Sequence, residues 1–244
     1  HCNNRSPRFN GNRQGIQELV DYTNNIIYNW GGNNIYAGEG GNYNIINNYF
    51  KYGPSTSKNV RYRIVNPGKT ETIPFGKWYV NGNHVDEATD VSGNNWLGVH
   101  MGNGGTDEDK RIAVIDQPHP AGAMNIQTAV AAYESVLNHA GASYSRDTLD
   151  ERIISDVKNR KGFIIDVQGG YPHHSPFELT VNAWPALRSD PAPVDRDKDG
   201  MPDDWEKKNG LNPSDATDAI QIKLHGFYTN IEVYINSLPK WERG

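Results

Sequence analysis

Three stretches of the chain carry an asparagine at an equivalent place. This weak repeat restricts the possible folds more than any other feature of the sequence. The stretches cover residues 20–27, 43–50 and 78–85, and the shared positions are Asn25, Asn48 and Asn83. The intervals are 23 and 35 residues, and the longer one contains turn-forming Gly-Pro and Pro-Gly pairs typical of an inserted loop. A repeat in the low twenties predicts a β-solenoid whose asparagines stack in a ladder. The alternative is a set of unrelated hairpins with chance asparagines.

A twelve-residue acidic run near the C-terminus matches the ligand spacing of an EF-hand-type calcium loop. Gly200 stands at position 6, where such a loop turns sharply. The expected ligands, with Met201 contributing its carbonyl, are Asp195, Asp197, Asp199, Met201, Asp203 and Glu206. We expect a structural Ca²⁺ here, against the alternative of a solvated acidic linker. A following pseudo-loop has Gln221, Lys223 and His225 at the first ligand positions, so no second ion is predicted.

Past residue 127 the hydrophobic period changes. Apolar residues at helical spacing predict a helix over 130–140 and a second that begins near Asp147 and ends before Gly162. Residues 163–167 are interpreted as a buried strand. Short helices are expected from Trp205 and over 227–235. We therefore expect three parts: a solenoid with long loops (1–127), a helix-and-strand extension packed on it (128–192), and an EF-hand-like calcium-binding tail (193–240).

Composition excludes some classes of function. The 244 residues carry a net charge of -5, which argues against general nucleic-acid binding, and no apolar run is long enough to span a membrane. The first 17 residues nevertheless hold three arginines and no acid, a local cationic patch suited to an anionic ligand. The single cysteine, Cys2, excludes an internal disulfide. Trp30 and Trp78 are expected to pack in the core rather than to serve as sugar platforms. The His173-His174 pair is expected to lie on the surface rather than to bind a metal.

Several motifs resemble one enzyme family. Asn4-Arg-Ser-Pro-Arg-Phe-Asn-Gly11, followed by Val20-Asp-Tyr-Thr-Asn-Asn-Ile-Ile-Tyr-Asn29, resembles the pectate lyases of polysaccharide lyase family 1. Further stretches that resemble the Bacteroidetes branch of the family cover 77–83, 150–154, 184–187 and 199–206. The resemblance covers nearly the whole chain. It implies an all-β-dominated fold: C-terminal coils of a right-handed parallel β-helix, then a mixed region with short helices and the calcium-loop tail.

The resemblance also implies β-elimination on polygalacturonate (homogalacturonan). A base removes the proton at C5, the oxygen at C4 leaves, and the product carries a 4,5-unsaturated end. By resemblance the base is Arg5, and Arg8 binds substrate. An arginine is protonated at ordinary pH. From the residues alone, therefore, a charged clamp on carboxylates or a structural salt bridge stays open for both arginines.

Two departures from the family pattern affect these assignments. The second arginine of the family's Arg-x-Pro-x-x-Arg motif is Asn10 here, and Arg13 is a candidate to restore the charge, so Arg8, Arg13 and Asn10 are the expected substrate-binding residues. The family holds its catalytic calcium with acids that precede this motif, and none of the four residues before Arg5 is acidic. We therefore expect the C-terminal part of a longer lyase, with the catalytic calcium ligands in a missing N-terminal part.

The expected setting follows from the resemblance. The protein is predicted to be secreted, periplasmic or displayed on the cell surface, with an acidic polysaccharide as substrate. An N-terminal fragment of the same protein is a candidate partner, and otherwise a monomer is expected. Two other functions stay open: a non-catalytic pectin-binding or surface-display β-helix protein, and a galacturonan hydrolase or pectin methylesterase. The last two chemistries use paired carboxylates, and no obvious pair occurs in residues 1–50.

Overall fold

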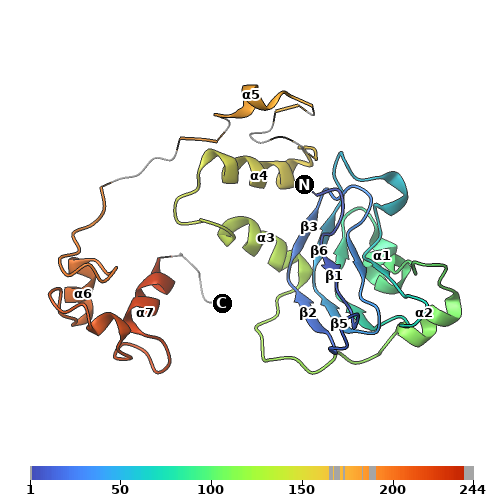
Figure 1. Cartoon of the computed structure of the whole chain (residues 1–244), viewed down its shortest axis with the longest axis horizontal. Coiled ribbons are helices and arrows are strands. Elements are labelled where there is room, and N and C mark those ends of the chain that lie inside the picture. Colours follow the sequence, from blue (N-terminus) through green and yellow to red (C-terminus); the bar gives the residue numbers. More distant parts are fainter. Residues whose placement is uncertain are drawn as a thin grey trace. The chain divides into compact units, whose positions relative to one another are not determined.

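The computed structural model describes residues 2–164, 167, 171–172, 174–182, 184–186 and 191–238. The chain divides into two compact units (Figure 1). The first consists of His1–Ala140 and Thr148–Trp184, and the second of Gly141–Asp147 and Pro185–Gly244. Within the described part of the chain, no helix combines the length and apolar character that crossing a bilayer requires.

Nine strands of the first unit form three parallel sheets, each of three strands. One sheet contains β1 (Arg8–Phe9), β4 (Ile35–Ala37) and β7 (Val65–Pro67). The next contains β2 (Leu19–Thr23), β5 (Asn42–Ile46) and β8 (Lys77–Asn81). The last contains β3 (Ile26–Tyr28), β6 (Tyr49–Lys51) and β9 (His84–Val85). Each strand from β1 to β6 thus pairs with the strand three places later, and equivalent residues of successive stretches lie in register.

The expectation of an all-β-dominated right-handed parallel β-helix is wrong. The described strands form three separate short sheets, none of which closes, and more residues lie in helices than in strands. Strand length explains part of this result, because each strand has only two to five residues. Asparagines in the left-handed conformation, Asn24, Asn29 and Asn47, end three of them. The fold is mixed, with helices following and flanking the sheets.

Aromatic side chains fill the interior of the first unit. The ring of Tyr43 stacks on Phe9 on one side, with centroids 4.9 Å apart, and on Trp78 on the other, at 4.1 Å. Trp30 meets Phe50 edge to face at 6.3 Å. Because both Trp30 and Trp78 are fully buried, their assignment to packing is confirmed. Burying such rings is the main hydrophobic contribution to this unit.

The predicted asparagine ladder is also confirmed. The side-chain amide of Asn25 donates to Asn48 Oδ1 at 3.0 Å, and that of Asn48 donates to Asn83 Oδ1 at 2.9 Å. The stack continues to Asn95, whose Oδ1 accepts from Asn83 at 3.0 Å and which the repeat did not reveal. Each Oδ1 also accepts the backbone N–H of the preceding ladder residue. These polar groups are therefore satisfied although Asn48, Asn83 and Asn95 are buried.

Beyond β9 the regular elements described in the first unit are helices: α1 (Thr89–Gly93), η2 (Asn95–Gly98), α2 (Asp107–Ala113), α3 (Ala129–His139), α4 (Thr148–Asn159) and α5 (Phe177–Thr180). A further short helix, η1 (Lys58–Val60), lies between β6 and β7. The two helices expected over 130–140 and from Asp147 are confirmed as α3 and α4. Of the strand expected over 163–167, Ile165 and Asp166 lie outside the described residues, and Phe163 and Ile164 form no strand. His173 and Leu187 of the discussed motifs also lie outside them.

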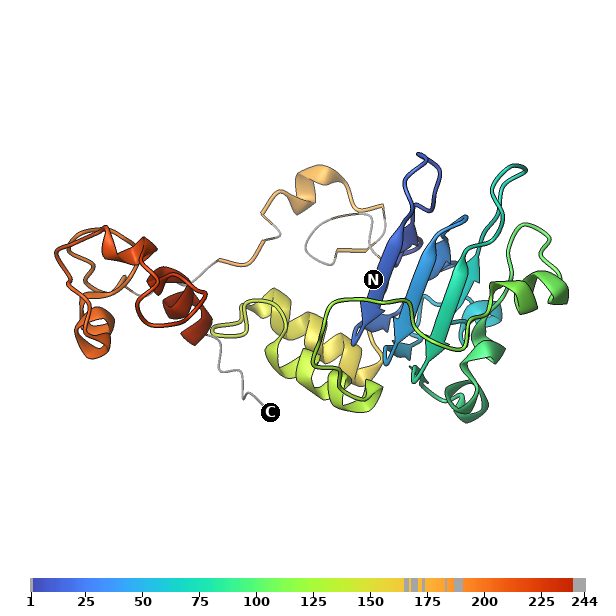
Figure 2. The ribbon, with the colours of Figure 1, turned by 90° about the horizontal axis from the view of Figure 1, so that it is seen from below.

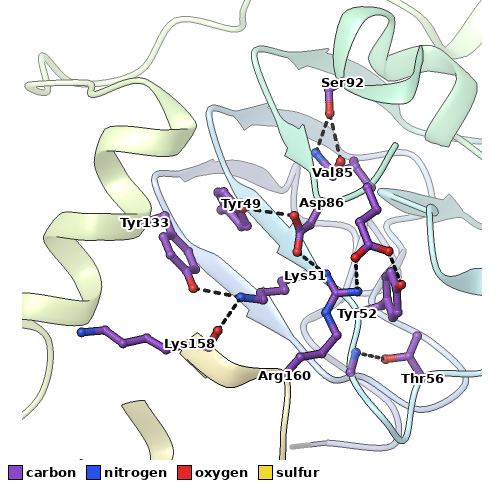
Figure 3. A network of polar contacts seen from close by, with 12 residues as sticks. Tyr49, Lys51, Tyr52, Thr56, Val85, Asp86, Ser92, Tyr133, Lys158 and Arg160 are labelled. Atoms are coloured by element: carbon purple, nitrogen blue, oxygen red, sulfur yellow. Dashed lines mark hydrogen bonds and ion pairs between the residues drawn. The ribbon is translucent and has the colours of Figure 1, made fainter. Parts of the chain in front are cut away.

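A polar network joins α3 and the end of α4 to the sheet β3–β6–β9 (Figure 3). Lys51 Nζ on β6 donates to Tyr133 Oη and to the Lys158 carbonyl, each at 3.1 Å. Arg160 forms ion pairs with Asp86 at 2.5 Å and with Glu87 at 2.8 Å. The Arg160 guanidinium also lies 4.1 Å from the centre of the Tyr52 ring. These contacts fix the helices to the sheet through charge-assisted hydrogen bonds.

The segment 115–128 crosses the outer face of the sheet β2–β5–β8 as a strap (Figure 2). At one end, Asn44 donates to the His119 carbonyl at 2.9 Å and accepts its N–H at 2.8 Å. At the other end, Asn24 exchanges the same pair of hydrogen bonds with Gln127, and Asn47 adds a third. Asparagine side chains therefore hold the strap at both ends.

The second unit is built on three short helices, α6 (Asp203–Asn209), η4 (Asp218–Ile220) and α7 (Asn230–Ser237). Its buried core consists of Met201, Leu211 and Ala219, with Trp205 and Tyr234 packed against it. The rings of Trp205 and Tyr234 meet edge to face at 5.1 Å. The expected packing of the final helix against Trp205 is confirmed.

Candidate functional site

The acidic run of the second unit folds into a tight loop that leads into α6. The left-handed backbone of Lys198 (φ 61°) and Gly200 (φ 95°) turns the chain. The Asp195 carboxylate accepts the N–H groups of both residues, at 2.7 and 3.0 Å. Asp199 Oδ1 accepts the N–H of Met201 at 2.8 Å. The backbone thus holds the carboxylates of Asp195 and Asp199 on the inside of the turn.

Several carboxylate oxygens in this loop and in the later residue Asp218 are buried and accept no hydrogen bond from any described residue. They are both oxygens of Asp197, Oδ2 of Asp199, both oxygens of Glu206 and Oδ1 of Asp218. Two triads contain them and share Asp199, with the oxygens within each triad less than 4.8 Å apart: Asp195–Asp197–Asp199 and Asp199–Glu206–Asp218. Buried carboxylates without donors are costly. A hard divalent cation such as Ca²⁺ would satisfy them, so these residues fit the expected ion.

The electrostatics of the loop lead to the same conclusion. Burial raises the pKa of the Glu206 carboxyl to about 7, and repulsion from the carboxylates around it, Asp199 first, adds to the rise. The pKa of Asp199 is raised as well, chiefly by burial. Crowded carboxylates resist ionisation unless a positive charge lies among them. A cation bound among these carboxylates would therefore favour their ionised forms.

Asp203 is placed differently from the other expected ligands. Its Oδ1 accepts the N–H of Arg196 at 2.9 Å, and its Oδ2 lies 3.3 Å from Arg196 Nε and 3.7 Å from Lys207 Nζ. The structure does not bring it into either triad. Met201 is buried in the core of the unit by its side chain. In the pseudo-loop, Glu232 caps α7 by accepting the N–H and hydroxyl of Thr229, each at 2.7 Å.

Sequence spacing did not reveal Asp218. It lies in η4, twelve residues beyond Glu206, where a twelve-residue loop pattern has already ended. Its carboxylate is nevertheless brought to Asp199 and Glu206 by the fold of the unit. No sequence motif singles out Asp218 from the nearby Asp215, whose carboxylate instead accepts the N–H and hydroxyl of Thr217. Burial and an unpaired oxygen are the signals that identify it.

The predicted arginine site lies in the first unit, around β1. Arg5 is exposed, and its backbone is left-handed (φ 64°). Arg8 is half-buried, and its guanidinium lies 5.9 Å from the centre of the Tyr36 ring on β4. Asn10 is exposed, and its backbone N–H donates to Glu18 at 3.2 Å. The described residues give neither Arg5 nor Arg8 an acidic partner within ion-pair distance.

Arg13 is paired differently. Its guanidinium binds both carboxylate oxygens of Glu39, with Nε 3.0 Å from Oε2 and Nη2 in close contact with Oε1. The Glu39 side chain is only 4% exposed. Burial acts to raise the pKa of Glu39, but the Arg13 hydrogen bonds and the charges of Arg13 and Arg8 lower it overall. The charge of Arg13 is thus largely balanced by Glu39, whereas those of Arg5 and Arg8 stay available to an anion.

An open cavity of about 320 Å³ lies elsewhere in the first unit, beside η2 and α2. Trp96, Asp107, Lys110, Arg111 and Val114 line it. The ammonium of Lys110 donates to the Val99 carbonyl at 2.7 Å. None of the predicted site residues lines this cavity.

The chain is similar to several proteins named as probable pectate lyases, and no family model matches it. It is 35% identical over 231 residues to a probable pectate lyase C of Aspergillus terreus. Over 233 residues it is 34% identical to proteins of the same name from Neosartorya fischeri and Aspergillus fumigatus. Each alignment covers 91% of this chain but 49% of the relative. The chain therefore spans about half the length of these relatives, and the matches support the resemblance to the pectate lyase family.

Proposed function

We propose that the chain is the C-terminal part of a pectate lyase that cleaves polygalacturonate by β-elimination. The observation that carries the proposal is the alignment of 91% of the chain with proteins named pectate lyase C. The relatives are about twice as long as the chain. The bacterial branch, and a secreted, periplasmic or cell-surface location, are parts of this proposal.

In the proposed reaction Arg5 is the base. Its neutral guanidine would take the proton from C5, and the electrons of the C5–H bond would form the C4–C5 double bond. The C4–O bond then breaks, and the leaving oxygen takes a proton from solvent. Exposure and the lack of an acidic partner among the described residues support the role.

Arg8 and Asn10 would hold the substrate. Arg8 can grip a uronate carboxylate with two parallel hydrogen bonds, while its guanidinium rests against Tyr36. Asn10 offers a neutral amide where the family motif has an arginine. Arg13 would contribute mainly by holding Glu39, so we assign it to shaping the site more than to direct binding. Charge from the catalytic calcium would be supplied with the remaining part of the protein.

The calcium of the 195–206 loop has a structural role in this proposal. Its candidate ligands lie in the second unit, whereas the arginines lie in the first. Asp197, Asp199 and Glu206 have buried oxygens without a donor among the described residues and would hold the ion, which would supply them with positive charge. The loop would then stabilise the tail without taking part in proton transfer.

The activity test is the near-ultraviolet absorbance of the unsaturated product released from polygalacturonate. We expect product from a full-length protein that contains this chain, and a loss of at least about 100-fold in kcat for Arg5→Ala, the size typical of removing a general base. Arg152→Ala, which removes an exposed arginine of α4, is the matched control and should keep full activity. Full activity in Arg5→Ala would exclude the mechanism.

A second candidate is pectin binding without catalysis, which the coverage of only 49% of the relatives favours for the chain by itself. Binding of polygalacturonate to the 244-residue chain without release of product would select it. In that case Arg8→Ala should weaken binding, because the carboxylate grip does not require proton transfer.

A further inference from the structure

Asp218 is held in place by hydrogen bonds that leave one of its oxygens free. Oδ2 accepts the N–H of Asn212 at 2.9 Å, and the backbone carbonyl accepts from the Asn230 side chain at 2.8 Å. The residue is 6% exposed, and Oδ1 has no donor among the described residues. That side chain offers an oxygen within 4.8 Å of carboxylate oxygens of Asp199 and Glu206. The fold therefore aims a buried, unpaired carboxylate oxygen at the acidic loop.

Asp203 shows the opposite arrangement. It occupies position 9 of the loop, where spacing predicts a ligand or a ligand to a bound water. Its two oxygens lie among positive donors instead, the N–H and guanidinium of Arg196 and the ammonium of Lys207. To bind a cation, Asp203 would have to leave these partners. The free energy of binding would then be reduced by their loss.

We propose that the cation of the 195–206 loop takes a carboxylate ligand from Asp218, outside the loop, in place of Asp203. The inference rests on the proposed calcium site. Ca²⁺ accepts six to eight oxygens in a flexible arrangement, so a ligand from a separate segment is compatible with its chemistry. The carboxylate set becomes Asp195, Asp197, Asp199, Glu206 and Asp218.

This ligand set changes what the ion holds together. A loop that uses only its own residues would order 195–206. Coordination by Asp218 also fixes η4, which is joined through Asn230 to the start of α7. The ion then links the acidic loop to the half of the unit whose own loop pattern is degenerate. One cation would stabilise both halves of the EF-hand-like tail.

The test is a pair of isosteric substitutions in the whole chain, titrated with Ca²⁺ by isothermal calorimetry. Asp218→Asn keeps an oxygen that can accept the Asn212 N–H, and we expect it to weaken Ca²⁺ binding by at least about tenfold, because affinity depends on the number of charged ligands. Asp203→Asn should change the affinity by less than about threefold. It should instead lower the melting temperature measured with chelator, because it loses the Arg196 and Lys207 pairs.

Glu206→Gln separates this inference from the proposed site itself. If the unmodified chain and Glu206→Gln give the same titration, the calcium site is wrong. If Glu206→Gln loses binding while Asp218→Asn binds as the unmodified chain does, the site stands and the role of Asp218 is wrong. Loss of binding in Asp203→Asn, whether or not Asp218→Asn also loses binding, would show that Asp218 does not take the place of Asp203 as a ligand. A melting temperature of Asp218→Asn in chelator at or above that of the unmodified chain checks that the variant folds.

Discussion

The arginines near the N-terminus differ in what lies beside them. Arg13 is bound to the buried carboxylate of Glu39, whereas Arg5 is exposed and Arg8 lies against an aromatic ring. Glu39 also accepts the backbone N–H of Asn12 through its carbonyl. The pair therefore joins the turn after β1 to the chain after β4, and its contribution is to folding as much as to charge.

Replacing Arg13 should show how much the Arg13–Glu39 pair contributes to the free energy of unfolding. We expect Arg13→Gln to lower the free energy of unfolding of the first unit by about 1–3 kcal/mol at pH 7, as when a charged hydrogen-bond partner is lost. Glu39 has a lowered pKa in the folded state, so its contribution is present above its unfolded pKa, about 4.3, and is lost as the pH falls through the folded value. The difference from the unmodified protein should therefore shrink on acidification.

Urea unfolding at pH 7 and pH 3, followed by tryptophan fluorescence, measures this difference. Lys58→Gln, at an exposed position, is the control and should stay within about 0.5 kcal/mol of the unmodified protein. A difference for Arg13→Gln that is the same at both pH values would contradict the assignment of the effect to Glu39.

Residue spacing identified one part of the candidate metal centre and missed another. Asp195, Asp197, Asp199 and Glu206 follow a local pattern, because the ligands of one turn must recur at fixed intervals. Asp218 and the Arg196–Asp203 pair depend on how separate segments meet, which no spacing encodes. The same holds for Arg13, whose partner Glu39 lies 26 residues away.

Among the elements, α3 and α4 are attached to the sheet β3–β6–β9 partly by charge-assisted hydrogen bonds and ion pairs. Arg160, just after α4, reaches Asp86 and Glu87, which follow β9. Lys51 on β6 reaches both helices, through Tyr133 and the Lys158 carbonyl. Lys51 is buried, so its ammonium needs hydrogen-bond acceptors inside the protein. The Tyr133 hydroxyl and the Lys158 carbonyl provide them, and the same contacts hold the helices on the sheet.

Removing the Arg160 ion pairs should loosen α4 without unfolding the sheets. We expect Arg160→Leu to cost about 2–3 kcal/mol, because the partly buried Asp86 carboxylate loses its charged partner. Arg152→Leu on α4 removes a looser pair, with Nη1 3.9 Å from Asp156 and the arginine side chain 41% exposed, and should cost less than about 1 kcal/mol. Hydrogen exchange should quicken at α4 amides in Arg160→Leu and stay slow in β5 and β8. Equal exchange in the two variants would argue against the network as the anchor.

Elements were predictable where a local period sets them. The asparagine ladder and the two helices follow from repeats of 23 and 35 residues and from helical spacing. The strap over β2–β5–β8 was not foreseen, since Asn24 and Gln127 are 103 residues apart. The dominance of β structure was wrongly predicted, because the repeat accounts for strands only as far as β9 and the regular elements described beyond it are helices.

At the scale of the whole molecule, two compact units with different cores should respond differently to metal. The candidate cation site belongs to the second unit alone. A ligand that binds only the folded form stabilises it by about 2.7 kcal/mol at 100 times its dissociation constant. Calcium should thus raise the unfolding temperature of the second unit and leave that of the first unchanged.

Differential scanning calorimetry with excess Ca²⁺ and then with EGTA should resolve this. We expect two transitions, of which one moves by several degrees on chelation. In Glu206→Gln that transition should sit at its EGTA position whether or not calcium is present. If both transitions move together, the two units unfold as one, and the proposal that the ion stabilises only the second unit is wrong.

The asparagine ladder has a consequence for how the protein tolerates change in length. Its rungs are 23, 35 and 12 residues apart along the chain, yet each pair makes the same side-chain contact within 0.1 Å. The hydrogen bonds of the stack therefore depend on the spacing between paired strands. They do not depend on the number of residues between one asparagine and the next. Loops between the ladder asparagines can therefore be long, as in the loop that contains η1, while the asparagine side chains keep the strands aligned. Peptide insertions in these loops should therefore alter the surface of the first unit without disturbing its paired strands.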